Sequence, residues 1–133
     1  MEQIILDKIQ GDPYAKSLGI KIVEIKEGFA EVQMTVQESM LNFHGAANGG
    51  VIFSLADVAF AIASNSYGQV AVGIHVSVNY MKAGKLGDTI SATATEVKKN
   101  PKLALYRMVV SNQDGELLAS LEGMVYRKKE MFA

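Results

Sequence analysis

One aspartate, Asp57, stands alone in the longest apolar stretch of the chain and is the first candidate for chemistry. The stretch runs from Leu41 to Ser66 and reads LNFHGAANGGVIFSLADVAFAIASNS. No Lys or Arg occurs between Glu27 and Met81, so no local cation neutralises the carboxylate. Burial raises the pKa of a carboxyl group and hydrogen bonds to its ionised form lower it. A solvent-facing Asp is the alternative, but exposed helix faces usually carry several charges, which favours a functional role.

Two glycines, Gly49 and Gly50, come just before the apolar run. Bare backbone N–H groups at a helix N-terminus lie at the positive end of the helix dipole, where they can hold an anion or a developing oxyanion. The alternative is that the glycines only turn the chain into the helix. Neither a Walker sequence nor the G-x-G-x-x-G spacing of a dinucleotide site is present, so no nucleotide loop is predicted.

Other catalytic sets are missing from the sequence. His44 and His75 have no acidic or cysteine cluster beside them, so no metal site is predicted. No G-x-S-x-G elbow exists and no histidine is local to Ser54, which argues against a Ser-His-Asp hydrolase. The chain has no cysteine, which excludes disulfides, thiolate zinc sites and a Cys nucleophile.

Length and charge indicate one ordinary globular domain. The 133 residues suggest a single domain over 1–133, and the net charge of −1 provides no electrostatic footprint for nucleic acid or an anionic membrane. The first ten residues mix charges with apolar side chains, unlike a signal peptide. The run 51–63 is shorter than the roughly 20 apolar residues that span a bilayer. We therefore expect a cytoplasmic protein without nucleic-acid or membrane partners.

The elements that must position Asp57 are one long helix and a set of alternating strands. We expect the helix over 48–67, with Ser54, Asp57, Ala61 and Ser64 on one stripe. Short helices are expected at 2–10 and 14–18, a hairpin at 19–26 and 29–36, and strands at 70–81, 89–98, 103–111 and 116–127, with a frayed tail at 128–133. This order predicts an α+β fold in which an antiparallel sheet wraps one central helix.

These residues resemble the hotdog-fold acyl-CoA thioesterases of the phenylacetic-acid-degradation (PaaI-like) type. The specific part is the glycine pair followed at helical distance by Asp57. The resemblance covers nearly the whole chain, and its motifs are N-F-H-G-x-x-N-G-G at 42–50, F-S-L-A-D-x-A-F-A at 53–61, N-S at 65–66, N-Y-M-K-A-G at 79–84 and G-D-T at 87–89.

The resemblance implies hydrolysis of an acyl-CoA thioester, here expected to be an aryl or medium-chain one, in a dimer joined by its sheet edges and often in a tetramer. It implies that Asp57 is the catalytic carboxylate, as general base or nucleophile, that the Gly49 N–H binds the thioester oxygen, and that Asn42 supports the site. No cofactor is expected, because coenzyme A enters as part of the substrate.

Two positions depart from the family pattern. The family commonly has His directly before the glycine pair, where this chain has Asn48, which can still donate a hydrogen bond. Some relatives place Ser or Thr on the following strand to position water, and Gly73 stands there. We expect His75 or Ser77, which alternation puts on the same strand face as Gly73, to substitute.

Substrate binding is also expected at Asn48, Gly50, His44 and Lys82, the last as a cation for the coenzyme A phosphates; Lys85, Lys98, Lys99 and Lys102 are further candidates. Two alternatives remain open. An enoyl-CoA hydratase or dehydratase would use a catalytic His, with His44 the local candidate. A non-catalytic acyl-CoA binding module would bind without releasing thiol.

Spacing limits how one subunit can use the two main candidates. Gly49 and Asp57 are eight residues apart, about 12 Å along a helix at about 1.5 Å per residue. Both cannot act on one thioester carbon from the same helix. We therefore expect Gly49 of one subunit to face Asp57 of the other across a two-fold axis, and a folded monomer to be inactive.

Overall fold

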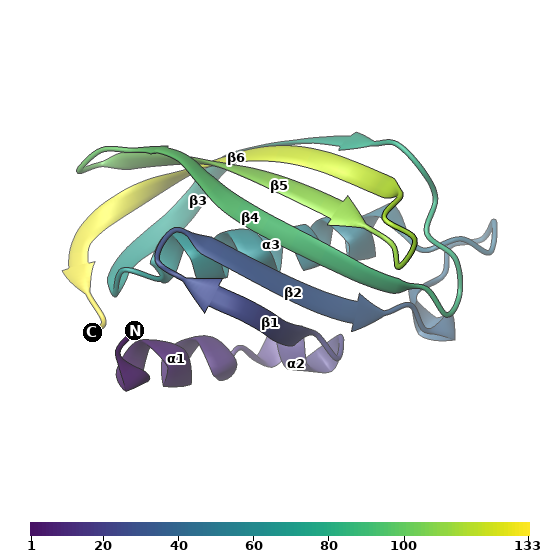
Figure 1. The fold of residues 1–133 in the computed structure, drawn as a ribbon, viewed down its shortest axis with the longest axis horizontal. Coiled ribbons are helices and arrows are strands. Elements are labelled where there is room, and N and C mark those ends of the chain that lie inside the picture. The colour runs from purple at the N-terminus through teal and green to yellow at the C-terminus, as the bar shows by residue number, and fades with distance from the viewer.

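The computed structural model describes residues 1–133 as a curved six-stranded antiparallel sheet around one long helix, α3 (Figure 1). The strand order is β1-β2-β4-β5-β6-β3. The strands are β1 (Lys21–Lys26), β2 (Phe29–Thr35), β3 (Gln69–Tyr80), β4 (Thr89–Lys99), β5 (Leu103–Ser111) and β6 (Leu117–Met131), and α3 covers Gly49–Asn65. The expected α+β architecture is therefore present.

Helix α3 forms the centre of the hydrophobic core. Buried side chains line most of its circumference, among them Leu55, Ala59 and Ala63, which are fully inaccessible to solvent. They pack against inward-facing residues of the strands, such as Val32, Ile90 and Met108. A helix that is apolar on most of its circumference must be buried on several sides, and the curved sheet contacts α3 on those sides.

The N-terminal segment lies across the open side of α3. It consists of α1 (Gln3–Gln10) and α2 (Pro13–Ser17), which Figure 1 shows outside the sheet beside β1. The side chain of Asp12 caps α2 by accepting hydrogen bonds from the N–H groups of Tyr14 and Ala15, with Pro13 at the first helical position, as predicted. Ile5 is the buried anchor of α1.

The expectation that residues 128–133 fray is wrong. Strand β6 continues to Met131, which pairs with Gln69, and the N–H of Phe132 donates to the carbonyl of Gly68. The charged residues at 128–130 hide this pairing in the sequence, since an edge of a sheet tolerates charges. The loop before α3 also holds a short 3₁₀ helix, Glu38–Met40, that the sequence pattern did not predict.

A β-bulge in β3 overturns the predicted faces of that strand. The register between β3 and β6 shifts between Gly73 and His75. Gly73 faces the helix, where an added Cβ would lie 3.1 Å from the Phe60 ring. Beyond the bulge, Val76 and Val78 pack toward the core, whereas Val72 and Ile74 are 39% and 55% exposed. Strict alternation fails because a bulge adds one residue to one strand.

Candidate active site

The N-terminus of α3 presents one free backbone N–H, that of Gly49. Asn48 is the N-cap, and its side-chain oxygen accepts from the N–H of Gly50 at 2.7 Å. Its carbonyl accepts from the N–H groups of Val51 and Ile52. The N–H of Gly49 donates to no acceptor within the chain. A free N–H at the positive end of a 17-residue helix suits a developing oxyanion.

This geometry refines three predicted residues. Asn48 is the N-cap of α3, and this capping role explains why an Asn suits this position. The N–H of Gly50 is already used by that cap, so Gly50 has no backbone donor to offer a substrate. The Gly49 carbonyl accepts a hydrogen bond from the Tyr80 hydroxyl at 3.0 Å, and an added Cβ on Gly49 would lie 3.3 Å from the Tyr80 ring. Tyr80 thus holds the first turn of α3.

The loop before α3 is held by Asn42. Its side-chain oxygen accepts from the N–H groups of His44 and Ala46 at 2.9 and 3.1 Å, and its amide nitrogen donates to no acceptor in the chain. The loop exposes Phe43, 94% accessible, with the His44 ring against it at a centroid distance of 4.1 Å. Asn42 therefore shapes the loop next to Gly49, which agrees with a supporting role.

Asp57 lies in the middle of α3, on its exposed stripe. The pKa of Asp57 is raised above its ordinary value. The larger cause is the loss of water around the carboxylate on burial, and the smaller one is the negative charge of Asp12. No cation pairs with its carboxylate. An unpaired carboxylate with a raised pKa is a stronger base than an ordinary surface aspartate, which suits proton abstraction.

Gly49 and Asp57 do not meet within one chain. Both belong to the same continuous helix, and eight residues place them about 12 Å apart along its axis. Each chain therefore carries the two proposed components at separate places.

The expectation that His75 and Ser77 share a face with Gly73 is wrong. Beyond the bulge, His75 pairs with Met124 and Ser77 with Glu122 on the outer face of the sheet, whereas Gly73 faces α3. A Cβ at position 73 would lie 3.1 Å from the Phe60 ring, so a Ser or Thr there would require the ring to shift by a few tenths of an ångström. This subunit therefore brings no water-positioning side chain from β3 toward the helix.

Lys82 lines a cavity of about 340 Å³ that also contains Gly49 and Tyr80. The Lys82 ammonium forms an exposed ion pair with Glu116. This hydrogen bond is the main cause that raises the pKa of Lys82 and lowers that of Glu116. Lys82 and Gly49 therefore line the same cavity. No cluster of three or more His, Cys, Asp or Glu side chains is placed to hold a metal ion.

Sequence reasoning missed the contribution of α2 to the site. The Tyr14 hydroxyl and Ser54 Oγ form a hydrogen bond of 2.9 Å, although 40 residues separate them. Ser54 lies one turn before Asp57 on the same stripe. The shared stripe is visible in the sequence, but nothing in the short segment around Tyr14 indicates where α2 docks.

Comparison with known proteins decides the family of this site. A family model described as the thioesterase superfamily matches residues 44–119, which include Gly49 and Asp57. The chain belongs to the thioesterase superfamily. The acyl-coenzyme A thioesterase PaaI of Escherichia coli is 41% identical over 118 residues, covering 89% of this chain and 84% of PaaI. A putative esterase of Archaeoglobus fulgidus is 46% identical over 123 residues, covering 92% and 80%.

Comparison with solved structures agrees with this assignment. The structure of E. coli PaaI, from the phenylacetic acid degradation operon, matches with a TM-score of 0.94 at 37% identity, covering 98% of this chain and 95% of that one. The smu.793 protein of Streptococcus mutans, solved with acetyl-CoA bound, matches with a TM-score of 0.81 at 30% identity, covering 84% and 90%. The predicted hotdog fold and PaaI-like family are thereby confirmed.

Proposed function

We propose that this thioesterase-superfamily protein hydrolyses acyl-CoA thioesters at sites shared between two subunits. The observation that carries the proposal is the free N–H of Gly49 at the start of α3, which has no acceptor in its own chain. The likeness to acyl-coenzyme A thioesterase PaaI over 89% of the chain supports the same reaction class.

The second subunit is proposed to bind through β3. This strand is 12 residues long, lies at the edge of the sheet and exposes Val72 and Ile74. A long apolar edge strand invites pairing with another chain. Antiparallel pairing of β3 with its copy would continue the sheet across a two-fold axis. The two α3 helices would then lie antiparallel on the same face, which brings Gly49 of each toward Asp57 of the other.

The reaction follows from these groups. The Gly49 N–H of one subunit polarises the thioester carbonyl. Asp57 of the other subunit accepts a proton from water as the water oxygen bonds to the carbonyl carbon, and the Gly49 N–H stabilises the resulting oxyanion. Collapse breaks the carbon–sulfur bond, and the proton on Asp57 passes to the departing coenzyme A thiolate. Direct attack by Asp57 is the other route open to a carboxylate here.

Release of free coenzyme A thiol tests the proposal. Asp57→Asn should lower kcat by roughly 10²–10⁴-fold, the range for loss of a general base. The matched control is Asp114→Asn, on an exposed turn, which should behave as wild type. Near-wild-type turnover by Asp57→Asn would contradict the mechanism, and tight acyl-CoA binding without thiol release by the wild type would favour a binding module instead.

A hydratase is less compatible with the geometry. It would need a histidine next to the carboxylate, but His75 lies on the outer face of the sheet and His44 is exposed beside Phe43. Within the thioesterase proposal, the aryl or medium-chain preference, the absence of a cofactor, the tetramer and the cytoplasmic location stay predictions. No helix of the chain has the length and apolar character needed to cross a membrane.

A further inference from the structure

Helix α2 is held against α3 by a hydrogen bond between two side chains. Ser54 Oγ donates its one hydrogen to the carbonyl of Gly50 at 2.8 Å, so the Tyr14 hydroxyl is the donor in its 2.9 Å bond to Ser54. Ser54 lies three residues before Asp57 on the exposed stripe of α3. The contact therefore fixes α2 within one helical turn of the candidate base.

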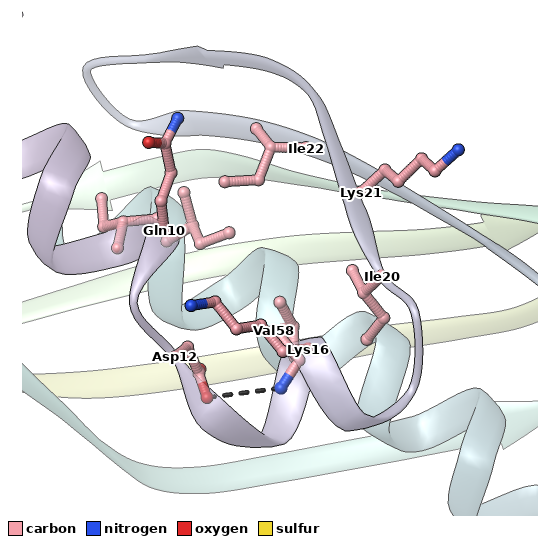
Figure 2. Close-up of a pocket in the computed structure, with 10 residues that line it drawn as sticks. Gln10, Asp12, Lys16, Ile20, Lys21, Ile22 and Val58 are labelled. Atoms are coloured by element: carbon pink, nitrogen blue, oxygen red, sulfur yellow. Dashed lines mark hydrogen bonds between the residues drawn. The ribbon is translucent and has the colours of Figure 1, made fainter.

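The start of α2 lies on the other side of Asp57 along α3. Asp12, the N-cap of α2, lines a cavity of about 350 Å³ together with Ala61, which follows Asp57 by four residues on the same stripe. Asp12 also lines a cavity of about 370 Å³ together with Val58, the neighbour of Asp57 in the chain (Figure 2). Residues 12–14 therefore cross α3 at the level of Asp57.

The carboxylate of Asp12 is held in place and carries an unpaired charge. Its Oδ1 accepts from the N–H groups of Tyr14 and Ala15 at 3.0 and 3.3 Å, and the second bond is the dashed line at Asp12 in Figure 2. Neither ion pair of the chain involves Asp12. Because no cation neutralises it, its negative charge acts on the groups beside it.

Four other charged side chains line the two cavities beside the stripe: Lys8 of α1, Lys16 of α2, Lys21 of β1 and Glu130 of β6. Figure 2 shows Lys21 extending away from Asp12. Burial is the larger cause of the raised pKa of Asp57, and Asp12 is the charged group that raises this pKa further. The position of Asp12 and its charge therefore both connect it to Asp57.

We propose that α2 is part of the catalytic site, with Asp12 as a positioning residue that acts on the reaction through Asp57 and the Tyr14–Ser54 bond as the contact that holds Asp12 there. The inference rests on the proposed thioesterase function. A negative charge beside a carboxylate favours the transfer of a proton from water to that carboxylate, because the proton cancels one of two like charges. A residue of the N-terminal segment thus sets the strength of the base on α3.

Replacing Asp12 with Asn tests the charge alone. The Asn side chain keeps the oxygen that caps α2 and removes the negative charge. The readout is the ratio of kcat/KM for octanoyl-CoA, variant over wild type, from thiol release at pH 4 and at pH 7. The ratio should fall below one at pH 7, where a weaker base accepts the proton less readily. It should be about twofold or more higher at pH 4, where more of the variant's Asp57 is ionised. Equal ratios at the two pH values would indicate a role limited to capping α2 and would overturn the proposal.

Two further variants complete the comparison. Asp7→Asn is the matched control, because Asp7 is exposed on α1 of the same segment and the charge that raises the pKa of Asp57 is that of Asp12. It should keep wild-type rates at both pH values. Tyr14→Phe removes only the hydroxyl that bonds to Ser54, and should change the pH dependence in the same direction as Asp12→Asn by a smaller factor. An unchanged pH dependence in Tyr14→Phe would overturn the role of the Tyr14–Ser54 bond.

An NMR titration separates this inference from the thioesterase function. If the wild type releases no thiol, the proposed function fails, and titration of the isotope-labelled Asp57 carboxyl group still tests the effect of Asp12. The Asp57 signal is assigned by its loss in Asp57→Asn. Its titration midpoint should move to lower pH in Asp12→Asn and stay at the wild-type value in Asp7→Asn. A midpoint that does not move in Asp12→Asn would overturn the proposal. Circular dichroism verifies that each variant is folded.

Discussion

Replacing Gly49 with proline removes the backbone N–H of residue 49 from the proposed site and leaves α3 in place. Gly49 is the first residue of the helix, where proline is favoured because its fixed φ is helical and its missing N–H would be free anyway. Asn48 has φ −60° and ψ 135°, a conformation that a residue before proline readily adopts. The substitution therefore deletes the oxyanion donor without breaking a hydrogen bond of the chain.

The expected loss is large and has a matched control. Removing one oxyanion donor costs roughly 10²–10³-fold in kcat, about 2.7–4 kcal/mol. Any Cβ at position 49 approaches the Tyr80 ring at 3.3 Å, so this ring, which is 52% exposed and bonded through its hydroxyl to the Gly49 carbonyl, has to shift by a few tenths of an ångström in either variant. Gly49→Ala adds the same Cβ and keeps the N–H, so it should retain most of the thiol release. Equal losses in Gly49→Ala and Gly49→Pro would attribute the effect to crowding and refute the oxyanion role.

Mixed dimers then test the shared site. A heterodimer of Gly49→Pro and Asp57→Asn subunits, isolated through two different affinity tags, should contain one site with both changes and one with neither. It should regain about half of the wild-type activity per dimer, although each parent is nearly inactive. If both groups act within one subunit, both sites of the heterodimer are damaged and no activity returns. Absence of recovery in a verified heterodimer would refute the two-subunit arrangement.

Three further predictions concern stability and substrate affinity. The pKa of Asp57 is higher in the folded chain than in the unfolded chain, so ionisation of Asp57 lowers the stability of the wild type as pH rises past about 3.9. Asp57→Asn should therefore have a higher Tm than the wild type at pH 7 and the same Tm near pH 3. An equal Tm of the two proteins at pH 7 would argue against a raised pKa. Gly123→Ala would place a Cβ 2.8 Å from Phe60 and should lower the free energy of unfolding by about 1–3 kcal/mol in urea titrations, with partial recovery on adding Phe60→Leu. Lys82→Ala should raise KM for acyl-CoA about threefold or more with little change in Tm, because its ion pair with Glu116 is exposed; an unchanged KM contradicts a role in substrate binding.

Much of the architecture was predictable because local signals agreed with the final packing. The apolar run around Asp57 specified a central helix, Asp12 and Pro13 specified the start of α2, and Gly28, at φ +76°, marked the hairpin turn. The separation of Gly49 from Asp57 was also predictable, since the eight-residue spacing along one helix is fixed by helix geometry alone.

What the sequence could not reveal are features set by pairing and docking. The shift between Gly73 and His75 depends on the partner strand β6, so no pattern within β3 marks it. The contact between Tyr14 and Ser54 depends on how a five-residue helix docks against α3. Gly49 and Gly50 are equivalent in the sequence pattern. Their N–H groups differ because the side-chain oxygen of Asn48 accepts from Gly50 and leaves Gly49 free.

The bulge in β3 also makes Ile74 the extra residue of this strand. The helix-facing positions fall at Ala71 and Gly73 before the bulge and at Val76 and Val78 after it. Deleting Ile74, the residue without a partner in β6, would restore regular pairing and leave both pairs facing α3, because the remaining positions then alternate in register with β6. Deleting Ser77 instead would make Val76 and Val78 neighbours in the chain and turn one of them away from α3. Loss of Ile74 should therefore lower stability less than loss of Ser77.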